Sequence, residues 1–126
     1  MDRNEERRFT TLLEAFEEFR ELDPDMPIQY ATSFLYICRY EGLSIKTLMD
    51  LIKLRQSSAS RNVSALSEWH KFDKPGLGLV QTFEDPKDRR KKTIELTEKG
   101  KKVFAQLSSI MERHEQRVAR QEARAS

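Results

Sequence analysis

The chain has 126 residues, of which 35% are charged and 37% are hydrophobic, and its formal net charge is +2. This length favours one compact domain with an extended arm, and the small apolar fraction predicts that a second copy covers part of the apolar surface. The single cysteine, Cys38, excludes an internal disulfide and a cysteine-rich zinc site, and the two histidines lack metal-ligand spacing.

No apolar run reaches the length of a membrane span, and the N-terminus lacks the apolar segment of a signal peptide, so a cytoplasmic protein is expected. The sequence has no nucleophile–base pair, no recognisable pair of catalytic carboxylates and no phosphate-binding loop. We therefore expect neither an enzyme nor a bound cofactor.

Charge is distributed unevenly along the chain. Residues 1–25 carry 4 basic and 9 acidic side chains, a net charge of −5. Residues 74–126 carry 13 basic and 8 acidic side chains, a net charge of +5. This acidic front and basic back predict a dipolar field around the molecule.

A first helix is predicted over residues 4–22, and its glutamates take the side opposite its apolar residues. The apolar residues recur at steps of three and four: Phe9, Leu12, Leu13, Phe16, Phe19 and Leu22. An apolar stripe with three phenylalanines needs a partner surface to pack against, and residues 1–25 are therefore assigned to dimerisation or docking.

A second helix is predicted over residues 27–40, because Pro24 ends the first helix and Pro27 suits a first turn. It is expected to be central and buried, since apolar residues cover most of its circumference. Gly42 is placed to end it in a left-handed cap. The expected stripe is Ile28, Ala31, Leu35 and Cys38, widened by Phe34 and Ile37. Cys38 is expected to be a small buried hydrophobe and not a redox sensor.

A third, short helix is predicted from Ile45 to about Lys53, with Ser44 as its N-cap. Its inward residues are Leu48, Leu51 and Ile52. A fourth helix is predicted a few residues later, over 55–69, with its apolar stripe at Ala59, Val63 and Leu66. A short helix, a tight turn and a helix with a polar outer face form the helix-turn-helix pattern.

The outer face of the 55–69 helix carries short polar groups and one guanidinium, with no carboxylate before Glu68. Such a face suits close approach to a polyanion, because serine can bond phosphates or base edges and arginine can bind guanine through two hydrogen bonds. An ordinary solvated helix face is the alternative interpretation.

The residues from 70 to 78 are rich in helix breakers and predict a loop. Strands are expected at 79–83 and 92–96, joined by a turn over 84–88, with Ile94 and Leu96 on one face. The tip of this hairpin carries Lys87, Arg89, Arg90 and Lys91. A basic hairpin directly after a helix-turn-helix is a wing, here assigned to residues 79–96.

Thr97 is expected to cap a last helix, with Glu98 in its first turn. The steps of its apolar stripe approach a coiled-coil seam, which assigns residues 98–126 to dimerisation, and the helix is expected to fray beyond Val118. The stripe comprises Val103, Leu107, Ile110, His114 and Val118, with Phe104 and Met111 alongside. His114 is expected at an interface or half-exposed, not as a ligand.

Several stretches together resemble MarR-type winged-helix transcription regulators over roughly residues 27–107. Gly78-Leu79-Val80, then Asp85-Pro86-Lys87-Asp88-Arg89-Arg90, then Leu96-Thr97-Glu98-Lys99-Gly100 are similar to the family's wing and following helix. Gln56-Ser57-Ser58-Ala59-Ser60-Arg61 resembles the start of its recognition helix. The resemblance implies a mainly α-helical fold with a small β-hairpin wing. A winged helix-turn-helix domain over 26–97 would stand between long terminal helices that form a dimerisation region.

Members of this family are typically homodimers that bind palindromic double-stranded DNA, with the recognition helix in the major groove and the wing at the minor groove. The resemblance implies that Arg90 is the minor-groove arginine and that Asp88 is the carboxylate that orients it. It also implies which recognition-helix residues face bases and phosphates: Gln56, Ser57, Ser58, Ser60, Arg61 and Asn62. Phosphate contacts are expected from Lys53, Arg55, Lys87, Arg89, Lys91 and Lys92.

Two features depart from the family pattern. The link from Trp69 to Leu77 is longer than usual, and only one long helix follows the wing where many members have another. No residue set indicates a small-molecule effector site. The leading expectation is a homodimeric transcriptional repressor. The alternative is a non-enzymatic protein-interaction adaptor that uses a winged-helix scaffold and docks a partner on its acidic first helix or its last helix.

Overall fold

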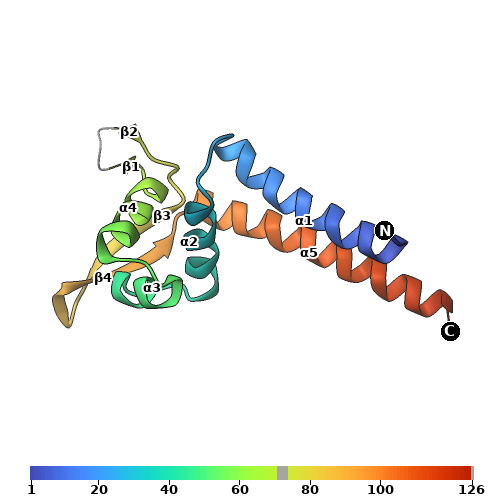
Figure 1. The fold of residues 1–126 in the computed structure, drawn as a ribbon. Coiled ribbons are helices and arrows are strands. Elements are labelled where there is room, and N and C mark those ends of the chain that lie inside the picture. The colour runs from blue at the N-terminus through green and yellow to red at the C-terminus, as the bar shows by residue number, and fades with distance from the viewer. Residues whose placement is uncertain (71–73, 126) are drawn as a thin grey trace. The chain divides into compact units, whose positions relative to one another are not determined.

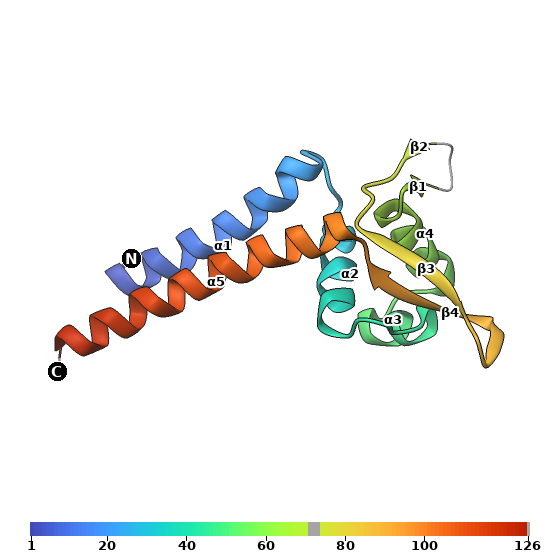
Figure 2. The ribbon, with the colours of Figure 1, turned by 180° about the vertical axis from the view of Figure 1, so that it is seen from behind.

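The computed structural model describes residues 1–70 and 74–125, so part of the predicted 70–78 loop lies outside the described residues (Figures 1 and 2). The chain forms two compact units, one of Met1–Asp25 with Val103–Ser126 and one of Met26–Lys102. The second unit extends to Lys102, beyond the predicted boundary at residue 97. No helix in the described part of the chain is long and apolar enough to cross a membrane.

The first unit, called the terminal unit below, consists of α1 (Arg3–Leu22) and most of α5 (Glu98–Ala125), which run antiparallel and side by side (Figure 1). Arg113 Nη2 lies 3.6 Å from Glu14 Oε2, and the Arg7 guanidinium donates a hydrogen bond to Gln121 Oε1. The predicted fraying beyond Val118 is wrong, because α5 continues to Ala125. The residues after Val118 are alanine, arginine, glutamine and glutamate, which are all strong helix formers.

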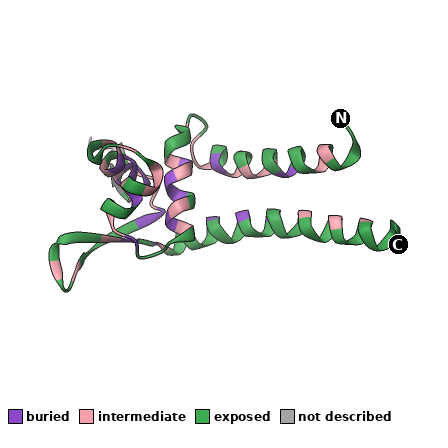
Figure 3. Cartoon of the chain, turned by 60° about the horizontal axis from the view of Figure 1, so that its bottom comes forward, coloured by how far each residue is buried: buried purple, intermediate pink, exposed green. Residues whose placement is uncertain are grey.

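Only a narrow edge of each terminal helix is buried (Figure 3). Val103, Leu107 and Ile110 are buried along α5 as predicted, and His114 continues this seam half-buried, with an Nδ1 that has no hydrogen-bond partner. On α1 the apolar stripe is largely exposed, and Leu13 is 62% exposed. These helices therefore leave a large part of their apolar surface uncovered.

The second unit, called the winged-helix unit below, begins with α2 (Ile28–Arg39). Its predicted apolar face is confirmed at Ala31, Phe34 and Ile37, which are buried. It is wrong at Ile28 and Leu35, which are 61% and 48% exposed, and Cys38 is only half-buried. The buried face consists of Ala31, Ser33, Phe34 and Ile37. Apolar residues surround most of this helix, so periodicity alone could not identify the face that packs into the core.

The end of α2 also differs from the prediction. The helix ends with Tyr40 as its C-cap, and Gly42 comes two residues later with a φ of +89°. Gly42 N donates to Ile94 O at 2.8 Å, and Ile94 N donates to Leu43 O at 2.9 Å. The left-handed glycine therefore does not cap the helix but turns the chain into a short antiparallel pairing with the wing, including a bridge between Ser44 and Thr93.

The helix-turn-helix consists of α3 (Ile45–Ile52) and α4 (Gln56–Leu66). Ser44 caps α3 as predicted, with its Oγ accepting from Thr47 N at 3.0 Å. Leu48 is fully buried, and Lys53 ends α3 in the left-handed conformation at a φ of 58°. The predicted stripe of α4 is confirmed, because it is buried throughout: Ala59, Val63 and Leu66.

The fourth helix is shorter than predicted and ends at Leu66. The segment after it folds back and supplies donors to the last carbonyls of the helix: Leu77 N donates to Ala65 O at 3.0 Å and Leu79 N donates to Leu66 O at 2.7 Å. These bonds satisfy groups that every helix end leaves unpaired. In place of a continuous loop, β1 (Trp69–His70) pairs with β2 (Lys74–Pro75).

The wing is an antiparallel hairpin of β3 (Val80–Asp85) and β4 (Asp88–Leu96), and both strands are longer than predicted. Ile94 and Leu96 are buried on one face, as predicted. Thr97 Oγ1 accepts from Gly100 N at 3.0 Å and so caps α5, and it donates to Gly78 O at 2.6 Å. The predicted fold class is confirmed: the chain is mainly helical with a small β-hairpin wing.

Candidate nucleic-acid interface

The two helices of the helix-turn-helix and the wing line one cleft of about 520 Å³. The backbone pairing of residues 42–44 with β4 places the start of α3 beside the wing, which makes this arrangement possible. The lining residues come from α3, α4 and β4: Ser44, Ile45, Lys46, Met49, Gln56, Ser60, Arg90, Lys91 and Lys92. This surface is called the basic cleft below.

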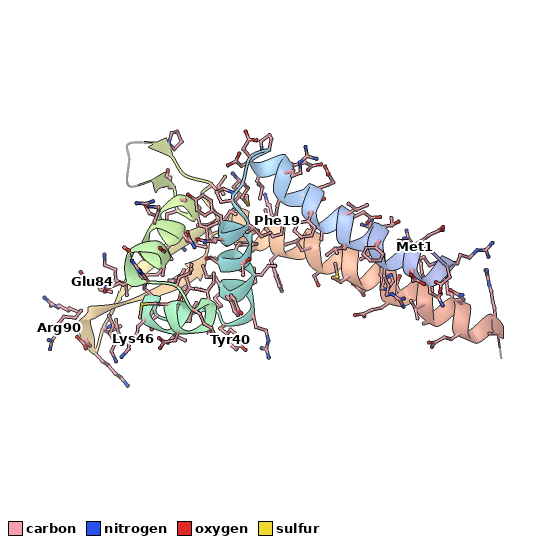
Figure 4. The ribbon with its side chains drawn as sticks, viewed as in Figure 1. Met1, Phe19, Tyr40, Lys46, Glu84 and Arg90 are labelled. Carbon is pink, nitrogen blue, oxygen red and sulfur yellow. The ribbon has the colours of Figure 1, made fainter. Side chains whose placement is uncertain are left out.

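Four cations contribute to the basic cleft, and no carboxylate lines it. Lys46 is not among the residues predicted from the sequence; it is exposed and lies with Arg90 at the same end of the winged-helix unit (Figure 4). Only the non-local pairing between residues 42–44 and the wing brings Lys46 there, so no local sequence signal identifies it. A concave surface lined by one sign of charge concentrates the electrostatic field and attracts an oppositely charged polymer.

The outer face of α4 is polar, as the sequence suggests. Gln56, Ser57 and Arg61 are exposed, and Ser58, Ser60 and Ser64 are half-buried. Arg55 is the N-cap, and no side chain caps the helix. The first backbone N–H groups of α4 therefore keep their capacity to donate to an anion.

The predicted nucleic-acid contact at Asn62 is wrong. Asn62 is only 2% exposed, and its Nδ2 donates a hydrogen bond of 3.1 Å to Ser33 Oγ, which is fully buried on α2. The residue lies on the inner side of α4, next to the stripe that includes Val63. Its polar character therefore serves a buried link between two helices.

Asp88 and Arg90 stand next to each other on β4. Arg90 N donates to Asp88 Oδ1 at 3.1 Å, and Arg90 Nε lies 3.7 Å from the same oxygen. The Arg90 side chain is 95% exposed and points away from the body of the unit (Figure 4). So exposed an ion pair contributes little to folding stability.

The other predicted basic residues of the wing are all exposed, but they do not share one location. Lys91 and Lys92 line the basic cleft, whereas Lys87 lies in the turn, where its N–H donates to Asp85 Oδ1 at 2.9 Å. Arg89, like Lys53 and Arg55, is exposed but is not part of the cleft lining. The structure thus gathers some of the predicted contacts into one concave surface and leaves others around it.

No group of three or more histidines, cysteines, aspartates or glutamates among the described residues could hold a metal ion. Burial, with a smaller effect from the Glu41 carboxylate, raises the pKa of Cys38 to about 12. A thiol with so high a pKa stays protonated at neutral pH and is a poor nucleophile.

No protein-family model and no curated protein matches the sequence, but solved structures do. A MarR-like transcriptional regulator from Thermotoga maritima is 28% identical, with a TM-score of 0.65 over 95% of this chain and 82% of that chain. The PcaV transcriptional regulator from Streptomyces coelicolor, solved with its natural ligand, is 26% identical, with a TM-score of 0.54 over 75% of this chain and 60% of that chain.

S. aureus MepR, solved in a complex with DNA, has a TM-score of 0.70 over 94% of this chain and 88% of that chain, and at 18% identity it supports the fold alone. These solved structures have a fold similar to that of this chain. The resemblance predicted from the wing and recognition-helix motifs is therefore confirmed at the level of the fold: this chain has the winged-helix fold of solved MarR-type transcriptional regulators.

Proposed function

We propose that the chain is a transcriptional regulator that binds double-stranded DNA in a sequence-specific manner and acts as a homodimeric repressor. The observation that carries this proposal is the basic cleft, in which Gln56 and Ser60 of α4 lie with Arg90, Lys91 and Lys92 of the wing. The cleft joins a polar helix face to a cationic hairpin. On a DNA duplex, the helix face would contact a groove and the hairpin would contact phosphates.

In this proposal the residues divide the work by their chemistry. Lysines and arginines around the cleft neutralise phosphates, which gives affinity that falls with salt but does not depend on sequence. Gln56, Ser57 and Arg61 on α4 read base edges in the major groove. Arg90, extended from the wing and oriented by Asp88, enters the minor groove, where a narrow A·T-rich segment concentrates negative potential.

Homodimerisation is proposed from the apolar surface of the terminal unit. Phe9, Leu13 and Phe16 on α1 and Phe104 and Met111 on α5 are all at least 40% exposed. So much exposed apolar surface on one pair of helices marks an interaction site. A second copy related by two-fold symmetry would cover it, and such a dimer would favour a palindromic DNA site.

The test is a binding-site selection from random duplex DNA with the full chain. The proposal predicts enrichment of a palindrome whose half-sites are separated by about one helical turn, or 10–10.5 base pairs. Indifference to duplex DNA at low salt would overturn it and would favour the protein-interaction adaptor instead. If a site is selected, the repressor function is tested by placing that site within a promoter and measuring transcription with and without the protein.

A further inference from the structure

A second positively charged cleft lies in the terminal unit, and none of the residues assigned to DNA lines it. It has a volume of about 560 Å³ and is lined by residues of α1 and α5: Arg3, Arg7, Arg117, Arg120, Gln121 and Arg124. The lining holds five guanidinium groups and no carboxylate. This surface is called the arginine cleft below.

Helix geometry explains how these side chains come together. Residues 117, 120, 121 and 124 are separated by three, one and three positions, which places them on one face of α5. Arg3 and Arg7 are four positions apart on α1 and therefore share a face of that helix. The hydrogen bond from Arg7 to Gln121 Oε1 holds the two faces against each other.

Among the described residues, no ion pair joins an arginine of this cleft to a carboxylate. The ion pairs found among the described residues use Arg20, Arg90, Lys101 and Arg113, and none uses Arg3, Arg117, Arg120 or Arg124. Arg7 donates to a neutral amide. Carboxylates occur nearby in the sequence, but the structure does not bring them into the cleft lining.

The preference of cations for the C-terminal ends of helices does not explain why these arginines lie together. Arg124 in the last turn of α5 is favourable there, because the C-terminal end of a helix dipole attracts cations. Arg3 opens the first turn of α1, where the same effect disfavours a cation. Its position next to four further guanidinium groups adds like-charge repulsion, which a bound anion would relieve.

We propose that the arginine cleft binds a small molecule that carries several negative charges on phosphate groups. The planar guanidinium group of arginine can donate two parallel hydrogen bonds to the oxygens of one phosphate. The cleft holds five guanidinium groups, so one carboxylate could not neutralise their combined charge. The volume of the cleft is sufficient for a phosphorylated small molecule.

The test is calorimetric titration of the full chain with pyrophosphate, and separately with orthophosphate, at constant ionic strength. Saturable binding of pyrophosphate, at least tenfold tighter than that of orthophosphate, is expected because charge is the main recognition element. Arg120→Gln should weaken pyrophosphate binding at least tenfold, and Arg120→Lys should give an intermediate loss because it keeps the charge but not the fork. Glutamine has a similar helix propensity to arginine, and circular dichroism verifies that the variants fold.

Arg113→Gln is the matched control, since Arg113 lies on the same helix, is paired with Glu14, and does not line the arginine cleft. It should leave pyrophosphate binding unchanged. An equal loss in both variants, or no saturable binding by the wild-type protein, would overturn the proposal.

Two further measurements separate this site from other uses of the same arginines. If Arg120→Gln dissociates the dimer and the wild-type protein does not bind pyrophosphate, a second copy's carboxylates fill the cleft and the proposal fails. If Arg120→Gln weakens binding to duplex DNA as much as it weakens pyrophosphate binding, the cluster is a nucleic-acid contact and the proposal also fails. If Arg120→Gln loses pyrophosphate binding but keeps DNA binding, the proposed phosphate site is supported. This result does not depend on whether the protein proves to be a transcriptional repressor.

Discussion

Gln56 on the first turn of α4 and Arg90 on β4 line the same cleft, although 34 positions separate them in the sequence. They meet because the chain between α2 and α3 pairs with β4, which fixes the wing beside the helix-turn-helix. A polar helix face and a cationic hairpin that open onto one concave surface can contact the same DNA duplex.

Arg61→Ala is expected to reduce sequence discrimination more than overall affinity. Arg61 is exposed on the polar face of α4, where an arginine can bind guanine in the major groove. The loss should be about 1–3 kcal/mol at a single base pair of the selected site. Competition between the selected site and each single-base variant measures it. An equal loss of affinity for every sequence would place Arg61 on phosphates and not on bases.

Asn62→Ala is expected to destabilise the fold by about 1–3 kcal/mol, because it leaves the buried Ser33 hydroxyl without its partner. Urea unfolding measures the change. Ser57→Ala, at an exposed position of the same helix, is the matched control and should stay within about 0.5 kcal/mol. An Asn62→Ala protein of unchanged stability but weaker DNA binding would restore the surface role that the sequence suggested for this residue.

The sequence predicted features that depend on local chemistry. The stripe of Ala59, Val63 and Leu66, the Ser44 cap and the hairpin wing all follow from spacing and residue type within a few turns of chain. The motif around Arg90 also indicated the fold that this chain shares with solved MarR-type regulators.

Features set by distant parts of the chain could not be predicted. The end of α4 at Leu66 depends on the segment 76–79, which folds back onto it. The inward position of Asn62 depends on Ser33 of α2, and the place of Lys46 in the basic cleft depends on the pairing of residues 42–44 with the wing. On α2, apolar residues occur on several sides, so the periodicity could not identify which side faces the core. Leu35 was therefore predicted to be in the core, although it is exposed.

Gly100→Ala is expected to destabilise the protein, although glycine to alanine within a helix usually stabilises it by about 1 kcal/mol. A Cβ at position 100 would lie 2.0 Å from the backbone carbonyl oxygen of Leu79, so the start of α5 would have to move away from the wing. Thermal unfolding measures the effect. Ser109→Ala, at an exposed position of the same helix, should leave the melting temperature unchanged or raise it slightly. A higher melting temperature for Gly100→Ala would contradict the close approach of α5 to Leu79.

Leu13→Glu is expected to weaken homodimerisation, because a charge replaces an apolar side chain that is 62% exposed in the single chain. Sedimentation velocity at several protein concentrations measures the change in the monomer–dimer equilibrium. Thr10→Glu, an exposed polar position on α1, is the matched control and should leave the equilibrium unchanged. A Leu13→Glu protein that dimerises as well as the wild type would remove α1 from the interface.

The most direct test of the basic cleft as the DNA interface is the salt dependence of DNA binding by the wild-type protein and by Arg90→Ala. Each phosphate that the protein neutralises contributes about 0.9 to the slope of log K against log salt. The variant should fold normally, bind more weakly and show a slope smaller by about one unit. Arg20→Ala, which removes an exposed arginine of α1 paired with Glu17, should bind DNA with the affinity and slope of the wild type. An Arg90→Ala protein with unchanged affinity and slope would contradict the assignment of the wing to DNA.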